Sequence, residues 1–392
     1  MKIAILTQPL SSNYGGILQC YALQTILTRL GHSVIVLSRN RPPAPRWKNW
    51  YWFAKRCCLY YVLGNKRYSP FPRYTTKRWN TVTRNLTLFI SRQIHATPPI
   101  YTTQALRQSV LAHRIEGIVY GSDQVWRPGY SPEILDYFGA FLTAEDRILQ
   151  VAYAASFGVD QCEFSLLQLQ ACSALLRRFE AVSVREKSGI VLCRNCFGVD
   201  ACQMIDPTML LKMEDYIRLM EQADTKPSEG NLLVFFLDRS EEKQTIADAV
   251  AARGQLRPWN IGPKLNDSTQ SLEERILIPV EQWLRGFREA KMVVTDSFHG
   301  CVFSILFHKP FIAVGNAARG MTRFTSLLQL FGLEDRLVCS LEEFRSRQQE
   351  LAIPIDYAEV ESRLTQYREE ALDFLKRNLP ESTIVDGKTA MC

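Results

Sequence analysis

Short apolar runs alternate with stretches of helical period along most of the chain. The first run, Ile3–Leu6, is followed by a polar loop and a predicted helix whose apolar face recurs at every fourth position, at Leu18, Ala22, Ile26 and Leu30. Gly31 stands where a helix C-cap belongs, and Val34–Leu37 forms the next apolar run. This order of strand, helix and strand predicts a βαβ unit with parallel strands.

The same alternation returns further along the chain. Apolar runs at 117–120, 149–155 and 181–184 continue the first set, which we expect to end near Asp206-Pro207. A second set begins at 232–237 and includes a helix at 280–290, a strand at 292–295, a helix to His308, a strand at 311–314 and a terminal helix at 358–376. The pattern predicts an α/β fold of two Rossmann-like domains with parallel sheets, residues 1–207 and 208–392, facing each other across a cleft.

Composition narrows the class of protein. With 392 residues, of which 46% are hydrophobic, the chain can bury a large core. The opening apolar run is too short for a signal peptide, and no run approaches the ~18 residues of a membrane helix, so we expect a cytoplasmic protein. Eleven cysteines are scattered, and Cys193 and Cys196 form a single C-x-x-C without the second pair that a zinc site needs. We therefore expect reduced thiols, no metal and no cofactor.

Charge is unevenly distributed between the two halves. Residues 1–115 carry 17 Lys and Arg and no acidic residue, so the remainder has a net charge of −10 against the total of +7. Such asymmetry favours an anionic partner on the N-terminal side, namely nucleic acid, anionic lipid or a phosphorylated substrate. The alternative is a basic surface that only keeps the protein soluble.

Residues 40–80 interrupt the alternation, and we interpret them as an insertion in the first domain. They contain five prolines, ten Lys or Arg, and an aromatic cluster that includes Trp47, Trp50, Trp52 and Phe53. Together with the cations Arg46, Lys48, Lys55 and Arg56, these aromatic residues predict peripheral contact with an anionic membrane at its inner face. In the alternative, the aromatic side chains pack onto the first domain and the cations face water.

Candidate chemistry lies in the loops where a predicted strand gives way to a helix, because open α/β sheets bind ligands there. Asn13-Tyr14-Gly15-Gly16 offers two glycines for close approach of a ligand and free N–H groups for an anion, although Asn13 also fits a simple N-cap. The segment 121–126, Gly-Ser-Asp-Gln-Val-Trp, combines a carboxylate, an amide and an indole, which suits sugar binding. In the alternative, Trp126 belongs to the core.

Two further loops carry charged or titratable groups. Arg185 ends the strand at 181–184 and can hold a carboxylate or phosphate with two hydrogen bonds, unless Glu186 or another acid pairs with it. His299 leaves a strand and enters a helix, where the helix dipole favours an anion and an imidazole can transfer a proton near neutral pH. A lone histidine is usually structural, but this position beside Asp, Ser and Gly favours a catalytic role.

Six segments together resemble the signature segments of the polysaccharide pyruvyl transferase family. In chain order they are residues 13–24, 121–126, 153–158, 183–186, 206–208 and 295–300. The resemblance covers roughly residues 1–38 and 115–340 and omits the basic insertion and the tail. It implies a GT-B-like fold, phosphoenolpyruvate as donor substrate, a free or lipid-linked glycan acceptor, and a pyruvate ketal as product.

The resemblance also assigns roles to residues. His299 resembles the family's catalytic histidine and Arg185 its donor-binding arginine, with Ser297 and Gly300 next to the donor. Other branches of the family have arginine where this chain has Ser297, so Arg319 or Arg323 is expected to supply the missing charge. Asp123 is expected to orient or deprotonate the acceptor, which the following residues are expected to bind: Asn13, Tyr14, Gly15, Gly16, Gln124 and Trp126.

Two alternatives to this function come from different classes. A GT-B glycosyltransferase that uses a nucleotide sugar shares the fold, and fold does not fix function. A non-catalytic protein could instead use the basic segment to bind nucleic acid or a membrane surface, with salt-sensitive affinity. The motifs favour the transferase, with phosphoenolpyruvate and a glycan as partners and without nucleic acid.

Overall fold

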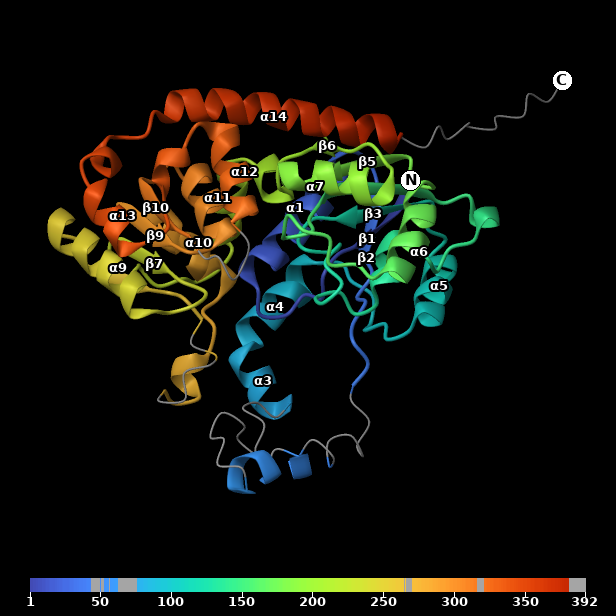
Figure 1. Ribbon diagram of the computed structural model, residues 1–392, viewed down its shortest axis with the longest axis horizontal. Coiled ribbons are helices and arrows are strands. Elements are labelled where there is room, and N and C mark those ends of the chain that lie inside the picture. Colours follow the sequence, from blue (N-terminus) through green and yellow to red (C-terminus); the bar gives the residue numbers. More distant parts are fainter. Residues whose placement is uncertain are drawn as a thin grey trace.

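Two parallel β-sheets lie side by side and carry helices on both faces (Figure 1). The computed structural model describes residues 1–43, 50, 53–55, 57–62, 76–263, 265, 270–315 and 321–380. The first sheet has the strand order β2-β1-β3-β4-β5-β6 and the second the order β11-β10-β9-β7-β8. All strand pairs in both sheets are parallel, as the alternation of strands and helices predicts.

The predicted βαβ unit opens the first domain. Ile3 of β1 pairs with Val34 of β2 on one side and with Gly117 of β3 on the other. Gly31 follows the intervening helix with φ of +82°, a left-handed conformation that glycine adopts without strain. The described elements of this domain are β1 (Lys2–Leu6), α1 (Tyr14–Arg29), β2 (Ser33–Val36), η1 (Cys58–Val62), α3 (Thr76–Val82), α4 (Arg84–Gln93), α5 (Thr103–Ala112), β3 (Gly117–Gly121), β4 (Leu149–Ala155), α6 (Leu166–Leu176), β5 (Ala181–Val184), α7 (Lys187–Leu192) and β6 (Cys202–Gln203).

The second sheet has its apolar strands at the centre. Strands β7 and β10 are buried along their whole length, as expected for strands covered by helices on both faces. The elements that follow β6 are η5 (Pro207–Leu210), α8 (Met213–Glu221), β7 (Leu232–Phe235), α9 (Glu241–Gly254), β8 (Pro258–Asn260), α10 (Val280–Glu289), β9 (Met292–Thr295), α11 (Phe298–Leu306), β10 (Phe311–Val314), α12 (Thr322–Phe331), β11 (Leu337–Val338), α13 (Leu341–Ser346) and α14 (Tyr357–Asn378).

The terminal helix α14 ties the two domains together. It begins at the second domain and runs across the top of the molecule to the first (Figure 1). The ring of Phe374 lies 6.2 Å from that of Tyr153 on β4. Arg368 donates hydrogen bonds to the carbonyls of Met209 (2.7 Å) and Leu211 (3.2 Å) in the connection between the sheets. A helix that the sequence places in the second domain therefore also packs on the first.

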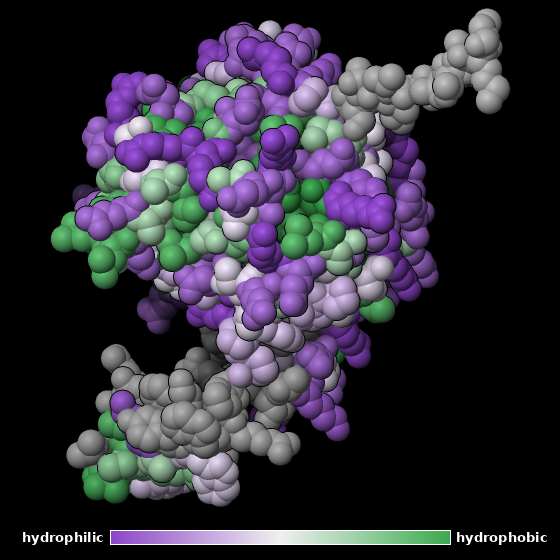
Figure 2. All heavy atoms as spheres, turned by 90° about the vertical axis from the view of Figure 1, so that its right-hand side faces the viewer, coloured by the Kyte–Doolittle hydropathy of each residue, from purple (hydrophilic) through white to green (hydrophobic). Residues whose placement is uncertain are grey.

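The described parts of the basic insertion, which include η1 and the start of α3, lie below the two domains (Figure 1). Among its described residues, Trp50, Tyr61 and Val62 are 75, 68 and 75% exposed, and Figure 2 shows apolar side chains on this lower lobe. No helix in the described part of the chain is long and apolar enough to cross a membrane. The other residues predicted for the membrane contact lie outside the described residues, namely Arg46, Trp47, Lys48, Trp52 and Arg56.

Candidate functional site

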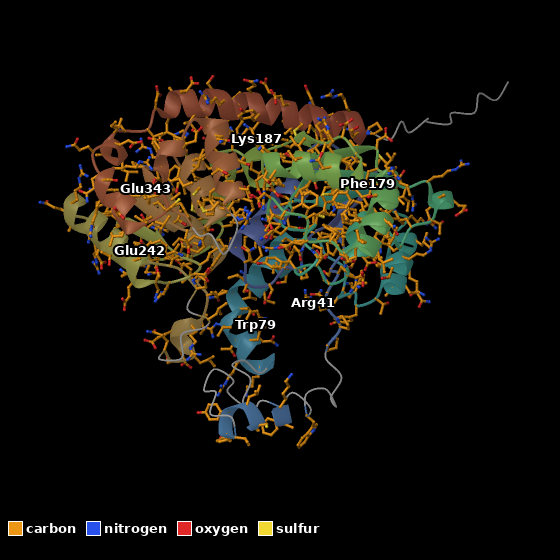
Figure 3. All side chains as sticks on the ribbon, viewed as in Figure 1. Arg41, Trp79, Phe179, Lys187, Glu242 and Glu343 are labelled. Carbon is orange, nitrogen blue, oxygen red and sulfur yellow. The ribbon has the colours of Figure 1, made fainter. Side chains whose placement is uncertain are left out.

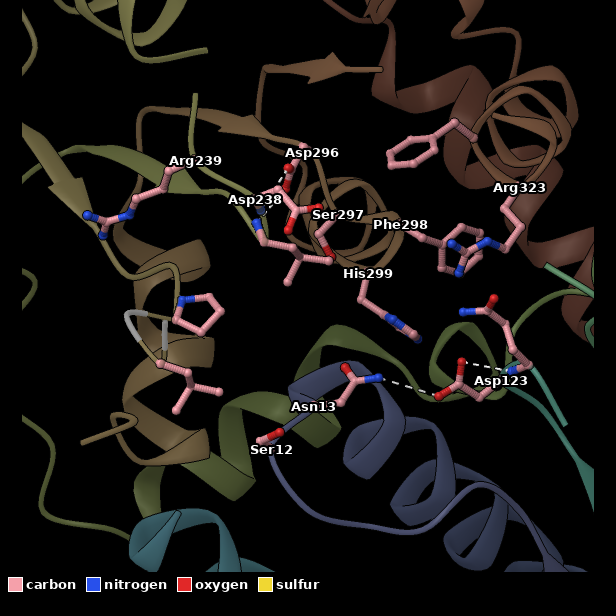
Figure 4. Close-up of a pocket in the computed structure, with 15 residues that line it drawn as sticks. Ser12, Asn13, Asp123, Asp238, Arg239, Asp296, Ser297, Phe298, His299 and Arg323 are labelled. Atoms are coloured by element: carbon pink, nitrogen blue, oxygen red, sulfur yellow. Dashed lines mark hydrogen bonds between the residues drawn. The ribbon is translucent and has the colours of Figure 1, made fainter. Parts of the chain in front are cut away.

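A cleft of about 620 Å³ lies between the domains, at the carboxyl ends of strands from both sheets (Figure 4). The first domain contributes the β1–α1 loop and the loop after β3. The second contributes the loop after β7, the β9–α11 turn and the start of α12. The lining residues on which the site depends are Asn13, Asp123, Gln124, Phe298, His299 and Arg323. This position agrees with the general rule for ligand sites in open α/β sheets.

His299 lies in the first turn of α11 and points from the second domain toward the first (Figure 4). Ser297 starts the helix, because its hydroxyl accepts a hydrogen bond from the Gly300 N–H at 3.4 Å. A Cβ on Gly15 would stand 1.9 Å from His299 Nδ1, so the imidazole fills the space above this glycine. The glycine that we predicted to admit a ligand therefore admits a side chain of the other domain.

Asp206 faces His299 from the first domain. Its Oδ2 lies 3.6 Å from His299 Nε2 and accepts hydrogen bonds from Arg185 Nη1 (2.7 Å) and Ser122 Oγ (3.1 Å), while Oδ1 accepts from Thr208. Burial alone would raise the pKa of the Asp206 carboxyl, but the contact with His299, together with Arg185 and Thr208, holds it well below its usual range. Asp206 is therefore a buried carboxylate that stays negatively charged next to the His299 imidazole.

Arg185 lies behind the cleft rather than in its wall. The guanidinium is covered by the Phe298 ring, whose centroid is 4.4 Å away, and its side chain is 2% exposed. Burial alone would lower the pKa of Arg185, but Asp206, Asp123 and Glu186 raise it above its ordinary value. In this structure Arg185 binds Asp206 and does not line the cleft, and its contact with a donor remains a prediction.

Arg323 of α12 lines the cleft, and Figure 4 shows it entering from the second domain like His299. Burial, and then the positive charge of Arg185, lower the pKa of Arg323 to about 10, so it remains a cation at neutral pH. The N–H groups of Phe298 and His299, at the start of α11, have no acceptor within the described part of the chain. A cation, a helix N-terminus and an imidazole thus meet at one end of the cleft. Arg319, the other arginine predicted for this role, lies outside the described residues.

The opposite wall carries an amide and a carboxylate. Asn13 occupies the N-cap position of α1, but its side chain makes no cap hydrogen bond; instead Nδ2 donates to Asp123 Oδ2 at 3.4 Å. Asp123 adopts φ of +67° and its Oδ1 accepts from the Gln124 N–H at 2.9 Å. Gln124 Oε1 in turn accepts from Arg127 Nη1 at 3.1 Å. These bonds fix the loop after β3 and leave the polar groups of Asn13 and Asp123 at the cleft surface.

Three predicted binding residues have other roles in the structure. Trp126 is fully buried, donates from Nε1 to the Tyr137 carbonyl (3.0 Å) and belongs to the core, so it cannot stack on a sugar. Tyr14 stacks on Trp283 of the second domain and donates to the Ile278 carbonyl at 2.9 Å. Gly300 uses its N–H in the helix cap, and a Cβ there would meet Thr295 Oγ1 at 2.1 Å.

Other polar residues near the cleft were not predicted. Asp206 stood in a matching segment, but neither its spacing nor its neighbours indicated a role. Asp296 is a structural anchor, because it accepts from the Leu237 N–H (2.6 Å) and from Lys243 Nζ (2.6 Å). Arg239 lines the far end of the cleft and donates to Asn260 Oδ1 at 3.3 Å. Within the described residues, no group of three or more His, Cys, Asp or Glu could hold a metal ion.

Comparison with solved structures finds sugar epimerases that share the fold over almost the whole chain, and this similarity, together with the two parallel sheets, confirms the predicted GT-B-like α/β fold. The UDP-GlcNAc 2-epimerase of Neisseria meningitidis, solved with UDP-GlcNAc, aligns over 97% of this chain and 99% of its own, with a TM-score of 0.50 and 11% identity. A putative UDP-N-acetylglucosamine 2-epimerase of Listeria monocytogenes aligns over 97% and 98%, with a TM-score of 0.50 and 10% identity.

Sequence comparison separates this chain from those enzymes. No curated protein matches it significantly. The sequence model of one family, described as "Polysaccharide pyruvyl transferase", matches residues 13–317. That range includes the cleft residues from Asn13 to His299 and ends before Arg323. The chain belongs to the polysaccharide pyruvyl transferase family.

Proposed function

We propose that this protein transfers the pyruvyl group of phosphoenolpyruvate to two hydroxyls of a sugar, forming a pyruvate ketal and releasing phosphate. The observation that carries the proposal is the cationic end of the cleft. There the N-terminus of α11 and Arg323 lie beside His299, an imidazole supported by the buried carboxylate of Asp206. A donor with two anionic groups and a carbon that must be protonated fits this set.

The donor binds, in this proposal, at the second-domain wall. The free N–H groups of Phe298 and His299 and the Arg323 guanidinium offer hydrogen bonds and positive charge to the phosphate and carboxylate. Ser297 replaces the arginine of other family branches, and its hydroxyl is already used as the helix cap. Arg323, on α12 two elements further along the chain, supplies the charge at this site in the proposal.

Three steps complete the transfer. His299, as imidazolium, gives its proton to the methylene carbon of phosphoenolpyruvate, which becomes a methyl group and leaves an oxocarbenium-like C2. One sugar hydroxyl adds to C2 and loses its proton to a base. Phosphate then leaves with the C–O electron pair, and the neighbouring hydroxyl adds to C2 and loses its own proton. One of these two protons restores His299 and the other leaves on phosphate, so the reaction is balanced.

The first-domain wall receives the acceptor in this proposal. Asp123 Oδ2 and the Asn13 amide lie opposite His299, where a carboxylate can accept the proton of an attacking hydroxyl and an amide can orient its neighbour (Figure 4). Asp206 acts as a positioning residue, since its fixed negative charge stabilises a positive charge on His299.

The direct test is turnover with phosphoenolpyruvate. Purified protein is incubated with the donor and with free or lipid-linked glycans, and phosphate release is followed together with the acceptor mass. The expected product is heavier than its acceptor by pyruvate minus water. Release of a nucleoside diphosphate from a nucleotide sugar, without consumption of phosphoenolpyruvate, would identify a glycosyltransferase instead.

We propose further that the basic insertion brings the enzyme to an anionic membrane on the cytoplasmic side. Trp50 and Phe53 are 75% and 39% exposed, their rings contact each other (6.3 Å between centroids), and Lys55, two residues after Phe53, is also exposed. Exposed aromatic rings beside cations favour the headgroup region of anionic membranes. A lipid-linked acceptor would be presented at such a surface.

A further inference from the structure

A line of three hollows extends from the cleft along the β1–α1 loop. The cleft shares Asn13, Asp123 and Gln124 with a second hollow of about 420 Å³. The second hollow shares four residues with a third, of about 610 Å³, namely Gln8, Pro9, Leu10 and Arg41. Each is large enough for a small ligand, so the series exceeds what phosphoenolpyruvate and one sugar would occupy.

We propose that these hollows form one groove that holds an extended glycan, with its terminal sugar at Asp123 and several further sugars in the second and third hollows. This inference rests on the proposed function, since it names the residues that would hold the glycan acceptor of that reaction beyond its terminal sugar. The groove is defined by Gln8, Arg41, Trp79, Asn80, Tyr101 and Tyr130.

The walls of the groove combine aromatic rings with neutral hydrogen-bonding groups. Tyr130 in the second hollow is 49% exposed, Tyr101 in the third is 41% exposed, and Trp79 is half-buried beside it. Asn80 adds an exposed amide. The apolar faces of sugar rings pack on aromatic side chains, while their hydroxyls need both donors and acceptors, which amides provide together.

The charges in the third hollow do not favour an anionic polymer. Its charged lining residues are Arg39 and Arg41. Arg39 is buried and paired with Asp136 at 2.6 Å. Arg41 donates to the carbonyls of Gly129 (2.9 Å) and Tyr130 (3.2 Å). Both guanidiniums are thus engaged with the protein, whereas a nucleic acid needs cations that face its phosphates.

The groove is held open by its own hydrogen bonds. Gln8 Nε2 donates to the Gln124 carbonyl (2.7 Å) and to Ser131 Oγ (2.9 Å), and Arg41 fixes the turn that carries Tyr130. The Arg127 guanidinium lies 4.4 Å from the centre of the Tyr130 ring and orients it. A preformed groove loses little freedom when a ligand binds, so weak contacts along a glycan add up.

The distal end of the groove lies at the base of the insertion. Arg41 and Pro43 lie on the segment that enters the insertion, and Trp79 and Asn80 lie on α3, which leaves it. Figure 3 labels Arg41 and Trp79 at the lower edge of the two domains, above the projecting lobe. A glycan whose terminal sugar is at the cleft would therefore extend toward the insertion.

The test compares acceptor lengths in Tyr101→Ala and Tyr101→Phe. Gluco-, galacto- and manno-oligosaccharides of one to five units serve as probes, with phosphoenolpyruvate as donor. In the wild-type protein we expect kcat/KM to rise with acceptor length in at least one series. Tyr101→Ala should reduce the ratio of kcat/KM for five units to that for one unit by roughly 3- to 10-fold, because a stacking face is lost. Tyr101→Phe keeps the ring and should keep the ratio.

Binding of the same oligosaccharides without donor, followed by calorimetry, separates this inference from the proposed function. Suppose that phosphoenolpyruvate is never consumed, but that the affinity for oligosaccharides rises with their length and falls in Tyr101→Ala. The groove is then supported, and the transferase proposal fails. If turnover occurs but neither turnover nor affinity depends on length in any series, the extended groove is wrong. The same conclusion follows if Tyr101→Ala leaves the length dependence intact.

Discussion

The two walls of the cleft carry different chemistry. The first-domain wall presents Asn13, Asp123 and Gln124, two amides and one carboxylate. The second-domain wall presents His299, Arg323 and the N-terminus of α11, and one of its carboxylates, Asp296, is neutralised by Lys243 at 2.6 Å. In the proposed reaction, this difference assigns the anionic donor to the second domain and the neutral, hydroxyl-rich acceptor to the first.

The walls are not independent, because His299 reaches across the domain junction. Its ring occupies the space above Gly15, and its Nε2 approaches Asp206, so two elements of the first domain position a side chain of the second. The His299 imidazole is thus held in this orientation only while the domains are packed together. The predictions below test the division and this dependence, from the largest expected effect to the smallest.

Loss of His299 should have the largest effect. We expect His299→Ala to reduce kcat with phosphoenolpyruvate by about 10²- to 10⁴-fold, because a positioned proton donor is removed. Donor affinity should change less, since the α11 N–H groups and Arg323 remain. Steady-state phosphate release measures the change. The matched control is His308→Ala, since His308 is partly exposed and pairs with Glu361 (3.1 Å) away from the cleft. Equal activity of the two variants would contradict the assignment.

Gly15→Ala tests the packing across the junction. The added methyl would stand 1.9 Å from His299 Nδ1 and must displace the ring, so we expect kcat to fall by roughly 10²-fold, the scale of an ångström-sized misplacement. At Gly16 the same methyl meets Asn13 and Asp123 side-chain atoms at 3.1 Å, and Gly16→Ala should cost less. Alanine has a higher helix propensity than glycine, so we expect the melting temperatures of the two variants not to fall together with kcat. If Gly16→Ala lowers kcat more than Gly15→Ala, His299 is not held by this contact.

The arrangement of the fold could largely be predicted, because long elements leave periodic signals. The βαβ unit from β1 to β2 and the β9–α11 unit that presents His299 both follow from runs of apolar residues with a polar turn between them. The short strands β6, β8 and β11 have two or three residues each, too few for any period to appear. The bridging position of α14 depends on tertiary contacts that sequence spacing does not contain.

Site residues could be predicted only where their place after a strand is enough to bring them to the cleft. His299, Asn13 and Asp123 follow strands directly and line the cleft. Trp126 also follows a strand, yet its ring stacks on Phe138 (5.2 Å) in the core, because burial depends on neighbours from distant segments. The role of Asp206 depends on its contacts with Arg185, Thr208 and His299. The local sequence around Asp206 does not indicate these contacts.

Replacement of Arg323 should affect donor binding. We expect Arg323→Gln to raise the KM for phosphoenolpyruvate by about 10- to 100-fold, the scale of a lost hydrogen bond to a charged group, with a smaller change in acceptor KM. Arg323→Lys should lie between, because the charge remains but the planar fork is lost. Arg288→Gln is the control, since Arg288 lies on the outer face of α10, near Glu221 (4.0 Å). An unchanged KM for phosphoenolpyruvate in Arg323→Gln would show that the donor phosphate does not bind at this wall.

The smallest effect should come from the insertion, which lies outside both walls. We expect the protein to sediment with anionic vesicles at low salt and to be released as salt increases, because the Debye length shortens. Trp50→Ser and Lys55→Glu should each weaken binding by about 1 kcal/mol, roughly fivefold, through loss of an interfacial ring or of a cation. Lys376→Glu, on α14 at the opposite side of the molecule, changes the net charge equally and should bind like the wild type (Figure 1). If Lys376→Glu weakens vesicle binding as much as Lys55→Glu, the attraction to the membrane is electrostatic but does not come from the insertion. If the wild-type protein stays in the supernatant with anionic vesicles at low salt, there is no membrane contact, and the acceptor reaches the cleft from solution.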